Sequence, residues 1–419
     1  MSKKINYRLY ISLLFLALCP AVYQIFRTYL IGSLPDPYTF SIAGQLSWIN
    51  LLFEILQEGL ILPLFYFLNK KDFSNRLKTG LIFTGASYTL LACIICVFVK
   101  PMLMFMNVSN DIINVSATYI RLESIANIFG IITSFLLVAM VTLEKSKIMY
   151  VLTIIRVILS FVGDLLFVSE SKISLRLGIN GIAYSNIISN IILIMVMIYF
   201  VKPCLKKEKL NFDWFKELFA IGGISGLESF VRNIAYTLMI SKMVNMVGEQ
   251  GTYWHANNFV WTWLLLPILQ LGELIKEEVS SNKDNIISYF KLTTTICVIW
   301  VLSIPLWKGF LSVINCDDID KVFTLLLILL PFYTLFAYQN IFDSIFYGSG
   351  KTNYMLFESI LTNTVYYGIA FVFYKINVWT PSLYSIAIMF GIGIAFDSIV
   401  SAIAYIIFKN LEPCNLIGI

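Results

Sequence analysis

Long apolar runs, separated by short polar stretches, dominate the hydrophobic pattern of the chain. Each run is long enough to cross the ~30 Å hydrocarbon core of a bilayer as a helix. The first six runs lie near residues 9–32, 38–68, 78–99, 112–142, 149–168 and 179–201. The second six lie near residues 216–247, 254–275, 286–313, 320–347, 354–375 and 383–408. The pattern predicts an all-α polytopic membrane protein with twelve transmembrane helices.

A short sequence in the second run returns in the eighth run at a constant offset of 213 residues. Eight of seventeen positions match: Ala43, Trp48, Leu51, Leu52, Ile55, Leu56, Gln57 and Gly59 return as Ala256, Trp261, Leu264, Leu265, Ile268, Leu269, Gln270 and Gly272. Chance similarity between two apolar helices is the alternative, but Trp, Gln, Gly and Ala in one register are uncommon matches. A repeat of this kind is typical of duplicated membrane transporters.

We therefore expect two pseudo-symmetric lobes of six helices each. The N-terminal lobe would span residues 1–205 and the C-terminal lobe residues 206–419. The break falls in the most charged linker of the chain, residues 202–209.

Composition agrees with a membrane protein. Hydrophobic residues make up 58% of the chain, charged residues only 13%, and the mean hydropathy is +0.81. This balance excludes a soluble protein. The first apolar run exceeds the length of a signal peptide and lacks a small-residue cleavage site, so we interpret it as the first span.

The distribution of Lys and Arg predicts the orientation. With the N-terminus inside, nineteen basic residues fall on the cytoplasmic side and about seven on the opposite side, which satisfies the positive-inside rule. Both termini are then cytoplasmic, and we expect a multi-pass protein of a bacterial plasma membrane. The net charge of +5 reflects this topology and does not indicate nucleic-acid binding.

Residues for metal, redox or nucleotide chemistry are sparse. The seven cysteines lack paired metal-ligand spacing, Cys93 and Cys96 lie in an apolar run where packing is the expected role, and His255 is the single histidine. Residues 348–352 (GSGKT) lack the first glycine of a phosphate-binding loop and a preceding strand. We therefore expect no metal, no cofactor and no enzymatic activity, so transport would be driven by an ion gradient or by a partner.

Several ionisable residues nevertheless lie inside the predicted spans. A charge at the bilayer centre costs between ~3 and more than ~10 kcal/mol, so such groups should face protein or a water-filled cavity. One stripe on the second span combines Ser47, Asn50, Glu54, Gln57 and Glu58. Its two glutamates have no basic residue on the same helix. They must find a cation elsewhere, on Arg27 or on a cationic substrate, or bind protons.

Four other spans carry polar groups, in three of them at helical spacing. Gln24 and Arg27 share a face of the first span, and Arg156, Ser160 and Asp164 share a face of the fifth. The sixth span offers Asn186, and the seventh places Glu228 four residues before Arg232, an order that favours an intrahelical pair. A purely structural interpretation has Arg27 or Arg156 neutralise Asp164, and Arg232 neutralise Glu228. Prolines inside four spans also predict kinks, at Pro20, Pro63, Pro267 and Pro331.

Four short motifs, at residues 27–32, 160–167, 177–186 and 346–352, together resemble those of the multidrug and toxic compound extrusion (MATE) family, within a superfamily that includes lipid-precursor flippases. Residues 27–32 (RTYLIG) are similar to the end of the first span of the family, which usually reads Asp-Thr-Ile-Phe-Val-Gly. Residues 160–167 (SFVGDLLF) resemble the family's Asn-x3-Asp motif, and residues 177–186 (LGINGIAYSN) its entry to the sixth span. Residues 346–352 (FYGSGKT) resemble the loop after the tenth span. The resemblance covers essentially the whole chain.

The resemblance implies a coupling and gating site in the first lobe, with one important departure. In one branch of the family an aspartate of the first span joins three other side chains to bind a proton or a sodium ion. The matching positions here are Arg27, Ser160, Asp164 and Asn186. An Arg27–Asp164 ion pair would replace the bound cation, which disfavours sodium coupling at this site. The carboxylates of the other branch match Arg232 and Phe336, although Glu228 lies one turn from Arg232.

We therefore expect a secondary active exporter that moves an amphiphilic or charged organic compound by alternating access, coupled to a proton rather than to sodium. The expected partners are this small substrate, the coupling ion and the lipid bilayer, and we expect a monomer. The residues expected to line the substrate cavity are Gln24, Glu54, Gln57, Glu58, Glu228, Arg232 and Gln270. The alternative is a flippase for a lipid-linked saccharide or a similar precursor, which inward-facing Arg27, Arg156 and Arg232 would favour.

Overall fold

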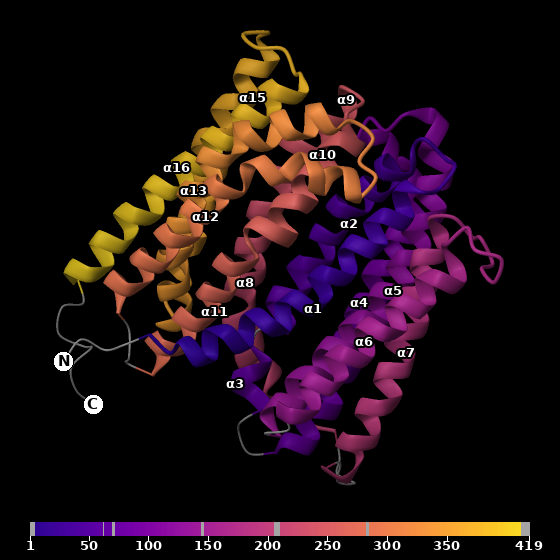
Figure 1. The fold of residues 1–419 in the computed structure, drawn as a ribbon. Helices are drawn as coiled ribbons and strands as arrows, with labels where there is room; N and C mark the ends of the chain where they lie inside the picture. Colours follow the sequence, from indigo (N-terminus) through magenta and orange to yellow (C-terminus); the bar gives the residue numbers. More distant parts are fainter. Residues whose placement is uncertain are drawn as a thin grey trace. The chain divides into compact units, whose positions relative to one another are not determined.

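The fold is all-α throughout the part of the chain that a computed structural model describes, which is residues 5–61, 63–68, 72–143, 146–204, 210–281 and 285–411 (Figure 1). The first helices are α1 (Tyr7–Gly32), α2 (Thr39–Leu60), α3 (Leu64–Leu68), α4 (Phe73–Phe105), α5 (Asn110–Thr142), α6 (Ser146–Phe167), α7 (Asn180–Val201) and the 3-10 turn η1 (Lys202–Cys204). The later ones are α8 (Phe215–Tyr236), α9 (Lys242–Met246), α10 (Gln250–Phe259), α11 (Leu266–Ser280), α12 (Ile286–Val313), α13 (Ile319–Gly348), α14 (Asn353–Leu361), α15 (Tyr367–Lys375) and α16 (Leu383–Leu411).

Three π-helical turns interrupt the later helices. They are η2 (Thr237–Ser241) between α8 and α9, η3 (Val260–Leu264) between α10 and α11, and η4 (Thr362–Tyr366) between α14 and α15. Turns of this kind are rare and occur preferentially at functional sites. The helix axis bends by 48° between α10–η3 and α11, next to Pro267, where a kink was predicted.

The predicted spans coincide with helices or with consecutive helical segments. Ten helices are long and apolar enough to cross a membrane, and the bent pair α10–α11 would be an eleventh. The predicted seventh span, on α8, is not among them, because Glu228, Arg232 and Asn233 make that helix polar. Length and composition therefore support ten or eleven of the twelve predicted spans within the described residues.

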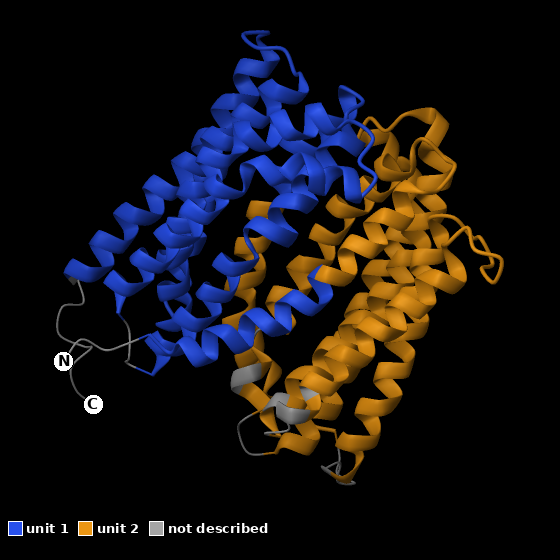
Figure 2. Cartoon of the chain, viewed as in Figure 1, with its two compact units in different colours: residues 1–21, 234–419 blue, residues 22–233 orange. Residues whose placement is uncertain are grey.

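The chain divides into two compact units (Figure 2). Unit 2 comprises residues 22–233, and unit 1 comprises residues 1–21 and 234–419. The predicted lobes were 1–205 and 206–419, so packing assigns the start of α1 to unit 1 and most of α8 to unit 2. Residues 205–209 of the predicted boundary lie outside the described residues, and the two six-helix lobes remain a prediction.

Unit 2 is built around α5, which packs along α4 and α7, with α2 and α3 against it and α6 against α7. An apolar cluster of Leu136, Leu152, Leu193 and Met197 joins α5, α6 and α7. Helix α8 approaches α2 so closely that a Cβ added at Gly222 would overlap the carbonyl oxygen of Gly59. Only glycine at this position permits that approach, which brings the polar faces of α2 and α8 together.

Unit 1 is built around α13, which contacts α10, α11, α12 and α16. An apolar cluster in it includes Leu274, Tyr289, Ile341, Phe346 and Phe408. The start of α1 joins this cluster, because the hydroxyl of Tyr10 donates to the carbonyl of Pro267 at 3.0 Å.

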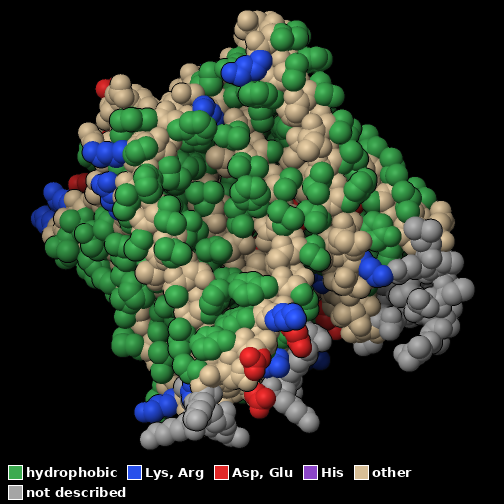
Figure 3. All heavy atoms as spheres, turned by 180° about the vertical axis from the view of Figure 1, so that it is seen from behind, with side chains coloured by type: hydrophobic (Ala, Val, Ile, Leu, Met, Phe, Trp, Pro, Cys, Tyr) green, Lys and Arg blue, Asp and Glu red, His purple; other side chains and the backbone are tan. Residues whose placement is uncertain are grey.

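Large apolar side chains cover the outward faces of the long helices (Figure 3). On α12, for example, Leu302 is 73% exposed and Leu306 72% exposed. A water-soluble protein would not present such faces, whereas lipid tails accommodate them. The structure therefore describes a multi-pass integral membrane protein. Several basic residues used to predict its orientation (Lys3, Lys4, Lys70, Lys71, Lys145 and Lys283) lie outside the described residues, as does Cys414, so the orientation remains a prediction.

Candidate functional site

Two groups of charged side chains lie inside unit 2. The first, which we call the Arg27 cluster, consists of Tyr23 and Arg27 on α1, Glu123 on α5, Asp164 on α6 and Asn186 on α7. The second, the Arg232 cluster, consists of Glu54 and Glu58 on α2 with Glu228 and Arg232 on α8.

Arg27 and Asp164 form a two-pronged ion pair at the centre of the Arg27 cluster. The guanidinium donates from Nε to Oδ2 at 2.9 Å and from Nη2 to Oδ1 at 3.0 Å. Tyr23 also donates its hydroxyl to Oδ2 of Asp164. The Asp164 side chain is only 1% exposed and that of Arg27 14%, so the pair is shielded from water. Buried two-pronged pairs of this kind are strong and geometrically specific.

A second carboxylate completes the Arg27 cluster. The same Nη2 of Arg27 donates to the side-chain oxygen of Asn186 at 3.0 Å. Asn186 in turn donates its amide to both oxygens of Glu123, at 3.0 and 3.2 Å. Glu123 is buried, and its position opposite Arg27 was not predicted. The sequence could have identified Glu123, because it is an ionisable residue inside the predicted span 112–142 and such residues are costly in a membrane.

The predicted coupling-site residues are therefore brought together, with a guanidinium at their centre. Ser160 is buried one turn before Asp164, where its carbonyl accepts from the hydroxyl of Ser185. Of the two proposed partners for Asp164, Arg27 is the one that contacts it. The alternative partner, Arg156, forms no such ion pair, and its side chain is exposed although it lies within electrostatic range of Arg27 and Tyr23.

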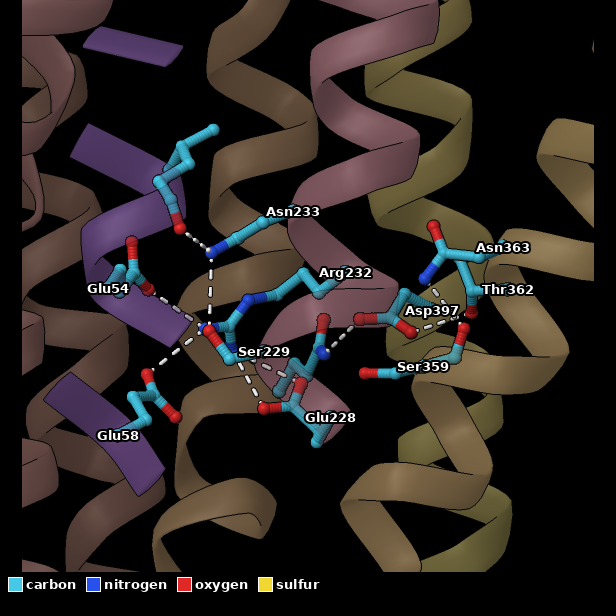
Figure 4. Close-up of polar contacts among 12 residues, drawn as sticks. Glu54, Glu58, Glu228, Ser229, Arg232, Asn233, Ser359, Thr362, Asn363 and Asp397 are labelled. Carbon is cyan, nitrogen blue, oxygen red and sulfur yellow. Dashed lines mark hydrogen bonds and ion pairs between the residues drawn. The ribbon is translucent and has the colours of Figure 1, made fainter. Parts of the chain in front are cut away.

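The Arg232 cluster joins three carboxylates to one guanidinium (Figure 4). Nη2 of Arg232 lies 2.9 Å from Oε1 of Glu54 and 3.1 Å from Oε1 of Glu58. Its Nη1 lies 3.2 Å from Oε1 of Glu228, four residues earlier on α8, as the helical spacing predicted. The suggestion that Arg27 neutralises the glutamates of α2 was wrong, because Arg27 is bound to Asp164 in the other cluster.

The side chains of the Arg232 cluster differ in their exposure. The side chains of Arg232 and Glu54 are 42% and 36% exposed, Glu58 is 17% exposed and Glu228 only 5%. Asn233, next to Arg232, donates to the carbonyl of Leu51 at 3.1 Å and so ties α8 to α2. Glu54 and Arg232 are thus accessible, whereas Glu228 is buried and Asn233 holds α8 against α2.

The other predicted cavity residues do not join these clusters. Gln24 on α1 and Gln57 on α2 make no side-chain hydrogen bond within the described part of the chain, and Gln57 is exposed. Gln270 lies on α11 in unit 1. Of the stripe predicted on α2, Glu54 and Glu58 contact Arg232, whereas Asn50, one or two turns before them, accepts from Asn127 at 3.0 Å.

The described residues contain no group of three or more His, Cys, Asp or Glu side chains arranged to hold a metal ion. His255 is buried within α10. In the loop before α13, burial raises the pKa of Cys316 to about 12, so its thiol stays protonated at neutral pH. This cysteine has the surroundings of a packing residue.

No family model matches the sequence, and no curated protein matches it. Solved structures do match nearly its whole length. A multidrug resistance MATE family transporter of the MOP superfamily, in an inward-facing conformation, aligns with a TM-score of 0.74 and 15% identity over 94% of this chain and 95% of its own. A MOP superfamily transporter from Pyrococcus furiosus aligns with a TM-score of 0.76 and 14% identity over 99% and 96%. A Vibrio cholerae MATE transporter variant aligns with a TM-score of 0.69 and 15% identity over 98% and 97%. These are transporters and not enzymes, and the chain has the fold of the MATE transporters of the MOP superfamily.

Proposed function

We propose that this protein is a secondary active exporter of an amphiphilic organic cation, which it moves outward by alternating access in exchange for protons. The Arg232 cluster carries the proposal. Three carboxylates share one guanidinium there, so the group is negative when all are ionised. Like charges held this close in a poorly solvated site favour the uptake of protons or of another cation.

An organic cation and a proton would compete for the same carboxylates. Glu54 is the most exposed of the three and Glu228 the least, so a substrate reaching the cluster would meet Glu54 and Glu58 first. Binding of the cation would displace protons from these two groups, which is the exchange that an antiporter requires.

The Arg27 cluster supports the proposal that the coupling ion is a proton rather than sodium. The guanidinium of Arg27 already donates to both oxygens of Asp164 and to Asn186, which in turn donates to Glu123. A sodium ion would have to displace a buried two-pronged pair to reach this carboxylate. We therefore assign the Arg27 cluster a gating or supporting role.

Transport of ethidium, a fluorescent organic cation, into proteoliposomes tests the proposal. We expect the double variant Glu54→Gln, Glu58→Gln to lose transport driven by a pH gradient while remaining folded. The matched control is Glu170→Gln, because Glu170 belongs to the same unit and pairs with Arg176 on the surface. Unchanged gradient-driven transport in the double variant would reject the role of the cluster.

One observation favours a second candidate, a flippase for a lipid-linked saccharide or a similar anionic precursor. Arg156 is exposed on the face of α6 that carries Ser160 and Asp164, and no ion pair of the described residues includes it. An accessible guanidinium there suits a phosphate-bearing head group. The matched Pyrococcus furiosus transporter is itself described as having a binding pocket of reverse polarity that suggests a different function.

Arg156→Gln separates the two candidates. A flippase would lose movement of a fluorescently labelled phosphatidylglycerol between leaflets while its ethidium signal stays the same. In an exporter of organic cations, ethidium transport would depend on the glutamates of α2, and Arg156→Gln would leave it unchanged.

A further inference from the structure

A single aspartate lies near the middle of α16 in unit 1, in a helix whose sequence is otherwise almost entirely apolar. Asp397 is half-buried, and its two carboxylate oxygens each accept a hydrogen bond from a different helical segment (Figure 4). The hydroxyl of Thr362, at the start of the π-helical turn η4, donates to Oδ1 at 2.7 Å. The amide of Gln339 on α13 donates to Oδ2 at 2.6 Å.

A neighbouring serine orients one of the two donors to Asp397. Ser398, the next residue on α16, donates to the side-chain oxygen of Gln339 at 2.9 Å, so the amide NH2 of Gln339 is directed at the carboxylate. Gln339, Ser398 and Thr362 are all buried. The carboxylate therefore joins three helical segments, α13, η4 and α16, through neutral partners.

No ion pair of the described residues includes Asp397. The elements packed against α16 are α13, α14, η4 and α9. Their acidic and basic side chains are Asp320, Lys321 and Asp343 on α13, Glu358 on α14 and Lys242 on α9; their tyrosines are Tyr333, Tyr338, Tyr347, Tyr354 and Tyr366. Tyr367, directly after η4, also lies within electrostatic range of Asp397. Lys321 pairs with Glu249 and Asp318, and Asp343 accepts from Ser401.

An ionisable group at the depth of the bilayer centre, held by neutral donors, changes its charge more readily than one locked in an ion pair, and such groups commonly mark proton relays. The adjoining π-helical turn η4 is a second indication, because such turns lie preferentially at functional sites. We propose that Asp397 is a proton-binding site of the transport cycle, located in unit 1.

Proton binding would change the bonds that hold the three segments. The carboxylate accepts from Thr362 and Gln339 when ionised. A proton that enters from water and binds Oδ1 makes this oxygen a donor and a weaker acceptor, so the Thr362 hydroxyl must accept from it, donate to it more weakly or turn away. The link between α16 and the π-helical turn then depends on protonation, and release of the proton restores it.

The proposal rests on proton-coupled transport, so the experiment separates the site from the coupling. Asp397→Asn keeps the shape and one acceptor oxygen but cannot ionise. In proteoliposomes we expect this variant to lose ethidium transport driven by a pH gradient and to keep ethidium exchange at equal pH. The matched control Asp343→Asn, on the neighbouring helix α13, should keep both. Gradient-driven transport in Asp397→Asn, or an equal loss in Asp343→Asn, would overturn the assignment.

A direct readout does not require coupling. Infrared difference spectra of the whole protein between acid and alkaline pH should contain a protonated-carboxyl band that disappears in Asp397→Asn and persists in Asp343→Asn. If the band is present but a pH gradient drives no transport in the unmodified protein, proton coupling fails and the protonation site stands. If the difference spectrum of Asp397→Asn matches that of the unmodified protein, the site is refuted.

Thr362→Val covers the case in which Asp397→Asn does not fold. It retains the aspartate and removes one donor to the ionised form, so the pH midpoint of transport should move to higher pH. A midpoint that does not move would count against the site, because a purely structural threonine would alter stability without altering the pH profile.

Discussion

Asp164 in unit 2 and Asp397 in unit 1 are two aspartates inside membrane-spanning helices, and their partners differ in charge. Asp164 receives a guanidinium, from Arg27, together with the hydroxyl of Tyr23. Asp397 receives only an amide and a hydroxyl, from Gln339 and Thr362. The first side chain is 1% exposed and the second residue is half-buried.

The difference separates two uses of an intramembrane carboxylate. A buried ion pair holds its carboxylate ionised, and breaking it leaves an uncompensated charge in a medium that solvates charge poorly. Neutral donors stabilise the ionised form of a carboxylate less than a guanidinium does. The Arg27 cluster thus has the character of a fixed element of unit 2, whereas Asp397 has the character of a switch in unit 1.

The largest expected effect comes from removing the cation of the fixed pair. Arg27→Gln leaves both Asp164 and Glu123 without their guanidinium, so we expect the free energy of unfolding to fall by about 3–5 kcal/mol. Denaturation in mixed micelles, followed by circular dichroism, measures this loss.

The double variant Arg27→Gln, Asp164→Asn is the control for charge, because it removes both members of the pair and should recover part of the stability. A single variant as stable as the unmodified protein would show that Asp164 is no more fixed than Asp397, and the comparison would fail.

A smaller effect is expected where α8 meets α2, the contact that assembles the Arg232 cluster. Gly222→Ala places a methyl group against the carbonyl oxygen of Gly59 and should cost about 1–3 kcal/mol as the two helices separate. Ethidium transport should fall with it, because Arg232 moves away from Glu54 and Glu58.

The neighbouring glycine is a matched control. A Cβ added at Gly223 meets no atom within 4 Å, so Gly223→Ala should be neutral or slightly stabilising in the same assays. Equal losses in both variants would mean that the helix backbone, and not the approach of α2, sets the effect.

The smallest effect belongs to the neutral bonds of Asp397. Thr362→Val removes one donor to a partly solvated carboxylate and should lower stability by about 1–2 kcal/mol. Thr364→Val is the control, because Thr364 is exposed and, within the described residues, its hydroxyl bonds to the carbonyl of Ile360 one turn earlier. A loss at Thr362 as large as that at Arg27 would contradict the distinction between a fixed pair and a neutral one, and thermal unfolding in detergent can compare the two.

Local pattern predicted much of the fold and part of the site. The apolar runs placed the helices, and the spacing of Glu228 and Arg232 predicted their pair, because both depend on residues within a few helical turns. The family resemblance at residues 27–32 and 160–167 predicted an ion pair between Arg27 and Asp164, and the structure contains this pair. The roles assigned to these residues stay predictions.

Other partners could not be predicted in this way. Arg232 meets Glu54 and Glu58 across 178 and 174 residues of chain, and Asn186 meets Glu123 across 63. Asp397 was missed altogether, since no other charged residue lies in the apolar run 383–408 to draw attention to it.

By itself, then, the sequence determined that this chain forms long apolar helices, that it spans a membrane many times, and that a few ionisable residues persist inside those helices. Helix formation and lipid exposure are local properties of hydrophobicity and period. Only the tertiary structure decided which charges pair across distant parts of the chain, such as Arg232 with Glu54 and Glu58, and which carboxylate is held by neutral groups. That choice depends on which helix faces pack together, as at Gly59 and Gly222, and such contacts join residues far apart in the chain.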